Sequence, residues 1–170
     1  MKTFRFNLSL LLGYIFILVG CHPAAVVLPP HIRTVGISNV ENRTSTYGLD
    51  SLLTEQTIRE FRQDGRLDYV PEGKADLLVN VTVTRYLKES ILTDTATNRP
   101  KQYRLSITYQ LKGVDQVDGR TLFDLTDQGR GVLYYTADFP GALVETEEQA
   151  QARLVEDLAR AIVRRTLEDR

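Results

Sequence analysis

The chain has 170 residues, and its 21 basic and 22 acidic side chains give a formal charge of −1 at neutral pH. Residues 1–20 contain two of the basic side chains and no acidic one, so the rest of the chain carries 19 basic and 22 acidic side chains, a formal charge of −3. This balance excludes the net basic surface that non-specific nucleic-acid binding requires, and we expect no nucleic-acid partner. The 150 residues after position 20 are enough for one domain with a hydrophobic core, and we expect one.

Residues 1–20 have the layout of a secretory signal peptide. Lys2 and Arg5 precede an apolar run of about a dozen residues, which is shorter than the roughly 20 residues that a membrane-spanning helix needs. The run closes with the sequence LVGC, which ends at Cys21, the only cysteine of the chain. This sequence resembles a bacterial lipobox, and the resemblance implies cleavage before Cys21 and a diacylglycerol thioether on its sulfur. We therefore predict that residues 1–20 are removed and that Cys21 is the lipid anchor.

The residues after Cys21 indicate in which membrane the anchor lies and how it is linked to the domain. Each buried methylene contributes roughly 0.8 kcal/mol, so a cysteine that carries more than one acyl chain stays on a bilayer. In Gram-negative lipoproteins an Asp at the next position favours retention in the inner membrane, whereas His22 predicts the periplasmic face of the outer membrane. The proline-punctuated sequence HPAAVVLPP excludes a continued helix, so we expect residues 21–30 to be a lipidated, extended tether before a domain over residues 31–170.

The first half of the domain predicts two short strands and a helix between them. Residues 34–40 alternate apolar and polar side chains as a short strand does, and residues 66–70 form a second strand. Residues 48–65 have apolar side chains at helical spacing. The buried stripe of this helix is expected to comprise Leu49, Leu53, Ile58 and Phe61.

The clearest pattern of the chain is the alternation in residues 75–90 and again in residues 103–113. Apolar side chains occupy every second position in both segments, which predicts two half-buried strands. The stretch between them, residues 89–102, is rich in Thr, Asp, Asn and Pro, and we expect a long exposed hairpin loop there. Loops of this kind often carry function on a rigid scaffold.

The last part of the chain predicts more strand and a long helix. Residues 121–127 and 132–135 have strand character, with a bulge or a bend near Gly129. Residues 145–167 predict a helix whose buried stripe comprises Leu154, Val155, Leu158, Ala161 and Ile162. Together these elements predict an α+β fold: a two-layer sandwich of two helices packed on one face of a mainly antiparallel or mixed sheet of about four to five strands.

No set of residues predicts catalysis or a metal centre. His22 lies in the tether and His31 where the tether joins the domain, so neither is placed for a Ser/His/Asp triad or a metal site. Carboxylates such as Asp115 and Asp124 fall in turn-like or strand-surface sequence, which does not favour a glycosidase pair. The glycines at 129 and 131 lack the rest of a phosphate-binding motif. We therefore expect no enzyme activity, no metal and no cofactor.

One group of basic residues is a candidate binding site. Five side chains lie at the ends of the two predicted hairpin strands or in the loop between them: Arg85, Lys88, Arg99, Lys101 and Arg104. A hairpin would bring them together at one end of the sheet, where they could bind the phosphates of an anionic lipid. The alternative interpretation is a solvated strand edge whose basic residues only discourage aggregation.

A series of short motifs follows the lipobox in a fixed order. The motifs are Asn42-x-Thr44 after the first strand, GLDxLLT at the helix start, ADLLVN at the start of the long strand, and a D-x-x-x-G turn at residues 115–119. In this order they resemble the LptE family of lipopolysaccharide-assembly lipoproteins, from Leu28 to about Tyr135. One departure is that many members carry Gly-Tyr directly after the lipidated cysteine, whereas His22 and a proline follow it here.

The resemblance implies a noncatalytic partner of a large LptD-like outer-membrane β-barrel. Such a lipoprotein plugs the barrel, helps to assemble it and assists delivery of lipopolysaccharide to the outer leaflet. Residues 89–102 would then be a candidate contact surface, and the five basic residues would meet lipopolysaccharide phosphates. Two alternatives remain at this point: a free-standing envelope lipoprotein that binds periplasmic glycan or another secretion component, and an enzyme acting on cell-wall material.

Overall fold

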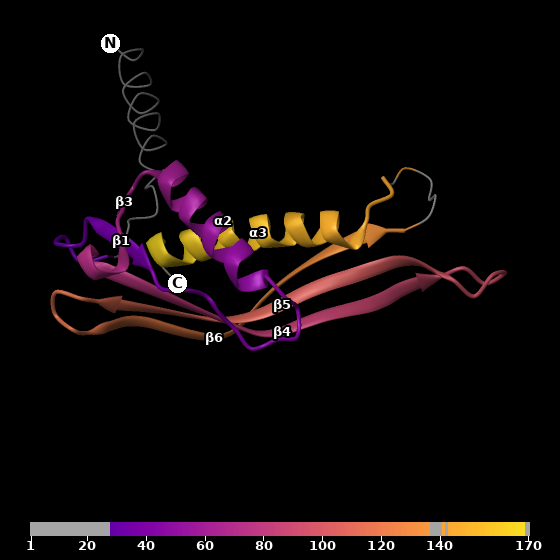
Figure 1. The fold of residues 1–170 in the computed structure, drawn as a ribbon, viewed down its shortest axis with the longest axis horizontal. Coiled ribbons are helices and arrows are strands. Elements are labelled where there is room, and N and C mark those ends of the chain that lie inside the picture. The colour runs from indigo at the N-terminus through magenta and orange to yellow at the C-terminus, as the bar shows by residue number, and fades with distance from the viewer. Residues whose placement is uncertain (1–27, 137–140, 142, 169–170) are drawn as a thin grey trace, which may run out of the picture.

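The computed structural model describes residues 28–136, 141 and 143–168 (Figure 1). The predicted signal peptide, Cys21 and most of the predicted tether lie outside the described residues. The elements, in chain order, are β1 (Thr34–Ile37), β2 (Glu41–Asn42), α2 (Leu49–Asp64), β3 (Asp68–Tyr69), the 3-10 turn η2 (Glu72–Lys74), β4 (Leu77–Thr93), β5 (Pro100–Asp115), β6 (Thr121–Tyr135) and α3 (Glu147–Leu167). Among the described residues, no helix is both long and apolar enough to cross a membrane.

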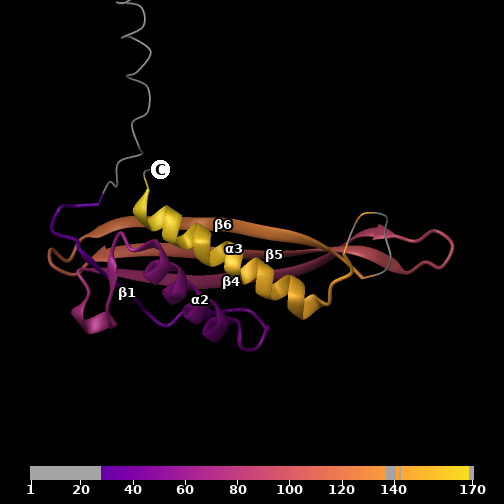
Figure 2. The same ribbon diagram turned by 90° about the horizontal axis from the view of Figure 1, so that it is seen from above.

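The strands of the described part form one mixed sheet. Its order is β3-β1-β4-β5-β6, and β2 also pairs with β4. The pairs of β1 with β3, β1 with β4 and β2 with β4 are parallel, whereas β4–β5 and β5–β6 are antiparallel. Both helices lie on the same face of this sheet, and no described helix covers the other face (Figure 1), while Figure 2 shows the helices from above. The predicted two-layer α+β sandwich is confirmed. The sheet has six strands, where about four to five were expected. The strand that the sequence did not reveal is β2, which is only two residues long and therefore has no visible alternation.

The core lies between the sheet and the two helices, and alternation along the strands fills it. Every second side chain of β4 and β5 points to the helices and is buried, namely Leu77, Val79, Val81, Val83, Leu105, Ile107, Tyr109 and Leu111. The stripe predicted for α3 is buried throughout. In α2, Thr57 takes the buried position predicted for Ile58, because its hydroxyl donates to the Leu53 carbonyl at 2.7 Å and is thereby satisfied inside the core.

The segment predicted as a long loop, residues 89–102, is mostly strand. β4 continues to Thr93 and β5 begins at Pro100, so only residues 94–99 form the turn, which we call the hairpin tip. The sequence pattern failed here because the Asp94 carboxylate organises a compact turn by accepting the backbone N–H groups of Ala96 and Thr97 at 3.0 and 2.8 Å. The tip projects at the end of the molecule opposite β1, beyond the start of α3 (Figure 1).

The irregularity in β6 lies next to the predicted position and not at it. β6 is one continuous strand, and Gly129 pairs with Thr108 in regular register. The shift falls between the pairs Leu125–Leu111 and Gln128–Tyr109, where Asp127 has a positive φ of 52°. Asp tolerates this backbone conformation because its short side chain can bond locally, so no glycine is needed at the bulge.

Candidate functional site

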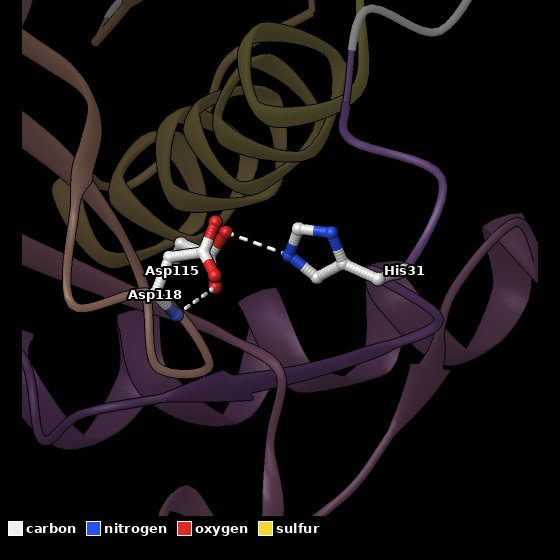
Figure 3. A group of neighbouring side chains, drawn as sticks. All are labelled: His31, Asp115 and Asp118. Atoms are coloured by element: carbon white, nitrogen blue, oxygen red, sulfur yellow. Dashed lines mark hydrogen bonds and ion pairs between the residues drawn. The ribbon is translucent and has the colours of Figure 1, made fainter.

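Two polar regions stand out, one at each end of the sheet. At the first end, His31 docks on the β5–β6 turn: its Nε2 lies 2.7 Å from Oδ2 of Asp115, a fully buried carboxylate (Figure 3). The other Asp115 oxygen accepts the backbone N–H groups of Val117 and Asp118 at 2.9 and 3.1 Å. Burial alone would raise the pKa of Asp115, but these two N–H groups and the imidazole hold that pKa below its usual range. The expectation that His31, at the junction with the tether, is not placed beside a carboxylate partner is therefore wrong.

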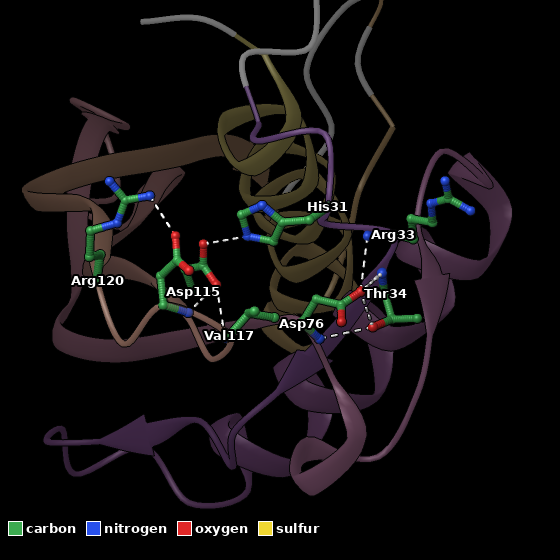
Figure 4. A network of polar contacts seen from close by, with 8 residues as sticks. His31, Arg33, Thr34, Asp76, Asp115, Val117 and Arg120 are labelled. Atoms are coloured by element: carbon green, nitrogen blue, oxygen red, sulfur yellow. Dashed lines mark hydrogen bonds and ion pairs between the residues drawn. The ribbon is translucent and has the colours of Figure 1, made fainter.

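A second carboxylate fixes the residues that follow His31. Oδ2 of Asp76 accepts the backbone N–H groups of Arg33 and Thr34 at 3.0 and 2.9 Å and the Thr34 hydroxyl at 2.8 Å (Figure 4). The Asp76 N–H donates back to the same hydroxyl at 2.8 Å. The Arg33 N–H, followed by the Thr34 groups, holds the pKa of Asp76 below its usual range. We call the contacts of Asp76 and Asp115 with residues 31–34 the N-terminal clamp, since they fix where the chain enters the domain.

Two residues of the N-terminal clamp and the neighbouring Asp118 are the three groups in the described structure that could share a metal ion. Ligand atoms of His31, Asp115 and Asp118 lie within 4.8 Å of one another. Each carboxylate nevertheless has protein partners, because Asp115 accepts three hydrogen bonds and Asp118 accepts the Arg120 guanidinium at 2.6 Å. The arrangement is therefore accounted for as a structural clamp. Sequence reasoning missed it because His31 and Asp115 are 84 positions apart.

At the opposite end, two of the five predicted basic residues are already paired. Lys88 lies on the helix-covered face, where its Nζ donates to Glu147 Oε2 at 2.5 Å and sits 4.5 Å from the centre of the Tyr103 ring. The hydrogen bond to Glu147 raises the pKa of Lys88 above its usual range. Lys101 forms an ion pair with Asp94 and so belongs to the hairpin tip. These two lysines hold the molecule together and are not presented jointly to a ligand.

The other three predicted residues remain available. Arg85 lies opposite Thr108, and Arg104 lies opposite Glu89, which places both arginines on the uncovered face of the sheet. Arg99 lies in the hairpin tip. All three side chains are exposed, and within the described residues none of them joins an ion pair. The structure therefore divides the predicted cluster into three free arginines and two paired lysines.

Apolar side chains accompany the arginines on the uncovered face. Leu87 lies one alternation step from Arg85 and is 40% exposed, and Leu133 pairs in register with Arg104 and is 43% exposed. Leu92, 38% exposed, follows toward the tip. Neither sequence reasoning nor the alternation pattern marked these leucines, because the opposite face of the same strands is the core. Guanidinium groups beside exposed leucines suit an amphiphilic ligand that carries both anionic groups and hydrocarbon.

Solved structures resemble this fold at low sequence identity. A hypothetical protein from Chlamydia trachomatis gives a TM-score of 0.53 at 12% identity, covering 78% of this chain and 94% of its own. A protein from Xanthomonas campestris gives 0.52 at 12% identity, covering 85% and 91%. Uncharacterised lipoprotein B from Nitrosomonas europaea gives 0.50 at 14% identity, covering 85% and 87%. Such identities show similarity of fold alone.

The sequence itself carries the family assignment. No curated protein matches the chain significantly. The family model described as lipopolysaccharide-assembly, LptE, matches residues 32–166, which begin directly after His31 and include the whole sheet and nearly all of α3. Because this match covers well over half of the chain, the protein belongs to the LptE family of lipopolysaccharide-assembly proteins.

Proposed function

We propose that the protein is a noncatalytic outer-membrane lipoprotein that partners an LptD-like β-barrel. In this role it plugs the barrel, helps to assemble it and assists delivery of lipopolysaccharide to the outer leaflet. The observation that carries the proposal is the family match over residues 32–166, which spans the described domain almost completely. The lipobox at Cys21 agrees with the same role, because an acylated cysteine confines the domain to one membrane face.

Confinement to the membrane also explains how a small domain can act on a large partner. A tethered domain meets a membrane-embedded protein at a high effective concentration, so modest contact energy is enough for stable association. The N-terminal clamp fixes the start of the domain at the end of the sheet that lies opposite the hairpin tip (Figures 1 and 4). The start of the domain and the hairpin tip therefore lie at opposite ends of the sheet.

The uncovered face is the part of the domain that we assign to lipopolysaccharide. Arg85, Arg99 and Arg104 would contact phosphates, while Leu87 and Leu133 would contact acyl chains. Lys88 and Lys101 stay in the candidate set only as residues that hold the surrounding structure, since each is already paired with an acid. Hydrogen bonds to charged groups contribute about 1.5–3 kcal/mol, so losing one of them costs roughly ten-fold or more in affinity.

Co-purification tests the partnership. Full-length tagged protein is extracted from native outer membranes in mild detergent, and the bound proteins are identified by mass spectrometry. We expect an intact outer-membrane β-barrel in stoichiometric amount. Recovery of the lipoprotein without any barrel would overturn the proposed function, and retention on periplasmic glycan instead would favour the free-standing alternative.

A charge-reversal pair tests the lipid contact. Arg85→Glu with Arg104→Glu should weaken binding to purified lipopolysaccharide by at least ten-fold, and the loss should shrink as salt rises because exposed charges are screened. The matched control is Arg164→Glu with Arg165→Glu, the same charge change on exposed residues in the last turn of α3. Equal binding by the two double variants would remove the arginines of the uncovered face from the proposal.

A further inference from the structure

One edge of β4 changes from paired to unpaired part-way along the strand. From Leu77 to Val83 this edge is occupied by β1 and β2, and it ends with the Arg43 N–H donating to the Val83 carbonyl at 2.9 Å. A bulge separates Val83 from Arg85, and beyond it β4 continues to Thr93. Within the described residues, β5 is the only strand that pairs with this second half. Its outer edge is therefore open for about 30 Å, at roughly 3.3 Å per residue.

The strand pairing identifies the main-chain groups on that open edge. Before the bulge, the outward carbonyls belong to odd-numbered residues, since those of Val79 and Val83 accept bonds from the β1–β2 side. The bulge adds one residue and shifts the alternation, so Arg85 and Leu87 bond to β5 while Tyr86, Lys88 and Ser90 point their N–H and C=O groups outward. These three alternate residues present the row of N–H and C=O groups with which an added strand would pair.

The second half of β6, at the other long edge of the sheet, is partly covered and so differs from the open edge of β4. On β6 the Tyr135 carbonyl accepts the Glu145 N–H at 2.8 Å, and the Leu133 carbonyl accepts the Arg153 guanidinium at 2.9 Å. The Arg130 side chain turns back to the Gly129 carbonyl at 3.1 Å. Proteins cap exposed edges in this way to prevent unwanted strand pairing. Within the part of the chain that the structure describes, these groups cover carbonyls in the second half of β6, whereas no hydrogen bond covers the edge of β4 beyond its bulge.

We propose that residues 86–90 of β4 dock an extended segment of the barrel partner as an additional strand of the sheet. This inference rests on the proposed function, because it assigns the edge to that partner. Continuity supports the assignment, since the new strand would follow β2 along the same edge of β4. Side chains define the segment. It would carry an acidic residue beside Arg85, whose five N–H donors can bind a carboxylate as well as a lipopolysaccharide phosphate, and an apolar residue beside the exposed Leu87, next to the acyl chains.

A proline on the edge tests the inference in the full-length protein. Ser90→Pro removes one outward N–H, and proline is tolerated on an edge strand whose N–H faces away from the sheet. Ser90→Ala is the matched control, because it loses the same hydroxyl and keeps the N–H. We expect Ser90→Pro to reduce co-purified barrel at least ten-fold, at equal amounts of the lipoprotein in the membrane, while Ser90→Ala retains it. Equal recovery with both variants would overturn the strand docking and leave the partnership intact.

Hydrogen exchange on the unaltered protein decides the matter if the proline variant fails to fold. In the co-purified complex, the amides of Tyr86, Lys88 and Ser90 should exchange at least ten-fold more slowly than in the barrel-free lipoprotein. The amide of Leu87, already bonded to β5, should change little. Unchanged exchange at Tyr86, Lys88 and Ser90 would refute the proposal. Protection that appears without the barrel and increases with lipoprotein concentration would also refute it, because it would indicate that the edge pairs with a second copy of the chain. If the unaltered protein recovers no barrel, the proposed function fails first and this inference falls with it.

Discussion

Gly113→Ala is expected to destabilise the domain, because Phe123 occupies the space that a side chain would need. Gly113 in β5 pairs in register with Phe123 in β6, and a Cβ on Gly113 would lie 2.3, 2.4 and 2.9 Å from three carbons of the Phe123 ring. The ring is 3% exposed and is part of the core, so it cannot swing into solvent. Overpacking of this kind costs about 1–3 kcal/mol. Because Asp115 follows two residues later, the same shift would loosen the N-terminal clamp.

Thermal and urea unfolding, followed by circular dichroism, measure this effect. At about 2–4 °C per kcal/mol for a chain of this size, the Tm should fall by about 2–12 °C. Gly73→Ala is the control, since a Cβ there meets no atom within 4 Å, and its Tm should stay near that of the unaltered protein. Adding Phe123→Leu to Gly113→Ala should recover part of the loss. A Tm for Gly113→Ala equal to that of Gly73→Ala would refute the packing argument.

Three further changes test the anchor, the clamp and the long helix. Cys21→Ala should move the protein from the membrane pellet to the soluble fraction, and a variant that still sediments would exclude the lipid anchor. Asp76→Asn should lower the Tm at pH 7. The folded state lowers the pKa of Asp76, so its carboxylate stabilises the fold above the ordinary pKa of about 3.9. The difference in Tm between the variant and the unaltered protein should therefore vanish as the pH falls from about 4 toward 2. A pH-independent difference would show that charge plays no part. Thr146→Ala removes one half of the capping box of α3 and should cost about 1 kcal/mol in urea unfolding, whereas no change would mean that the cap is redundant.

The regular part of the fold was predictable because burial imposes a period on the sequence. Val79, Val81 and Val83 alternate with polar residues, and the stripe from Leu154 to Ile162 follows the helical spacing, so both faces could be assigned without coordinates. The turn at residues 94–99 was overestimated in length because residues 89–93 and 100–102, which belong to the strands, are largely exposed and mostly polar, as loop residues are. Composition does not distinguish these two states when neither face is covered.

The site was less predictable, since its partners are distant in sequence. No sequence feature near His31 predicts its contact with Asp115, which lies 84 positions away. Likewise, Lys88 and Arg85 are both basic and three positions apart, yet a bulge between Val83 and Arg85 decides which face each one takes. Lys88 consequently meets Glu147 across the sheet and helix layers, while Arg85 faces outward. Alternation puts the two side chains on opposite faces, and the one extra residue before them makes Lys88 the structural cation and Arg85 the candidate ligand-binding one.

Photocrosslinking in intact cells tests the central claim, partnership with an outer-membrane barrel, most directly. A photoreactive residue at Thr95 in the hairpin tip is exposed and leaves the Asp94 turn contacts in place. The account predicts a crosslinked product that contains a lipopolysaccharide-export β-barrel, and no such product from the Cys21→Ala variant after its release from the membrane. Membrane-anchored protein whose tip crosslinks only to soluble periplasmic proteins, or to nothing, would contradict it.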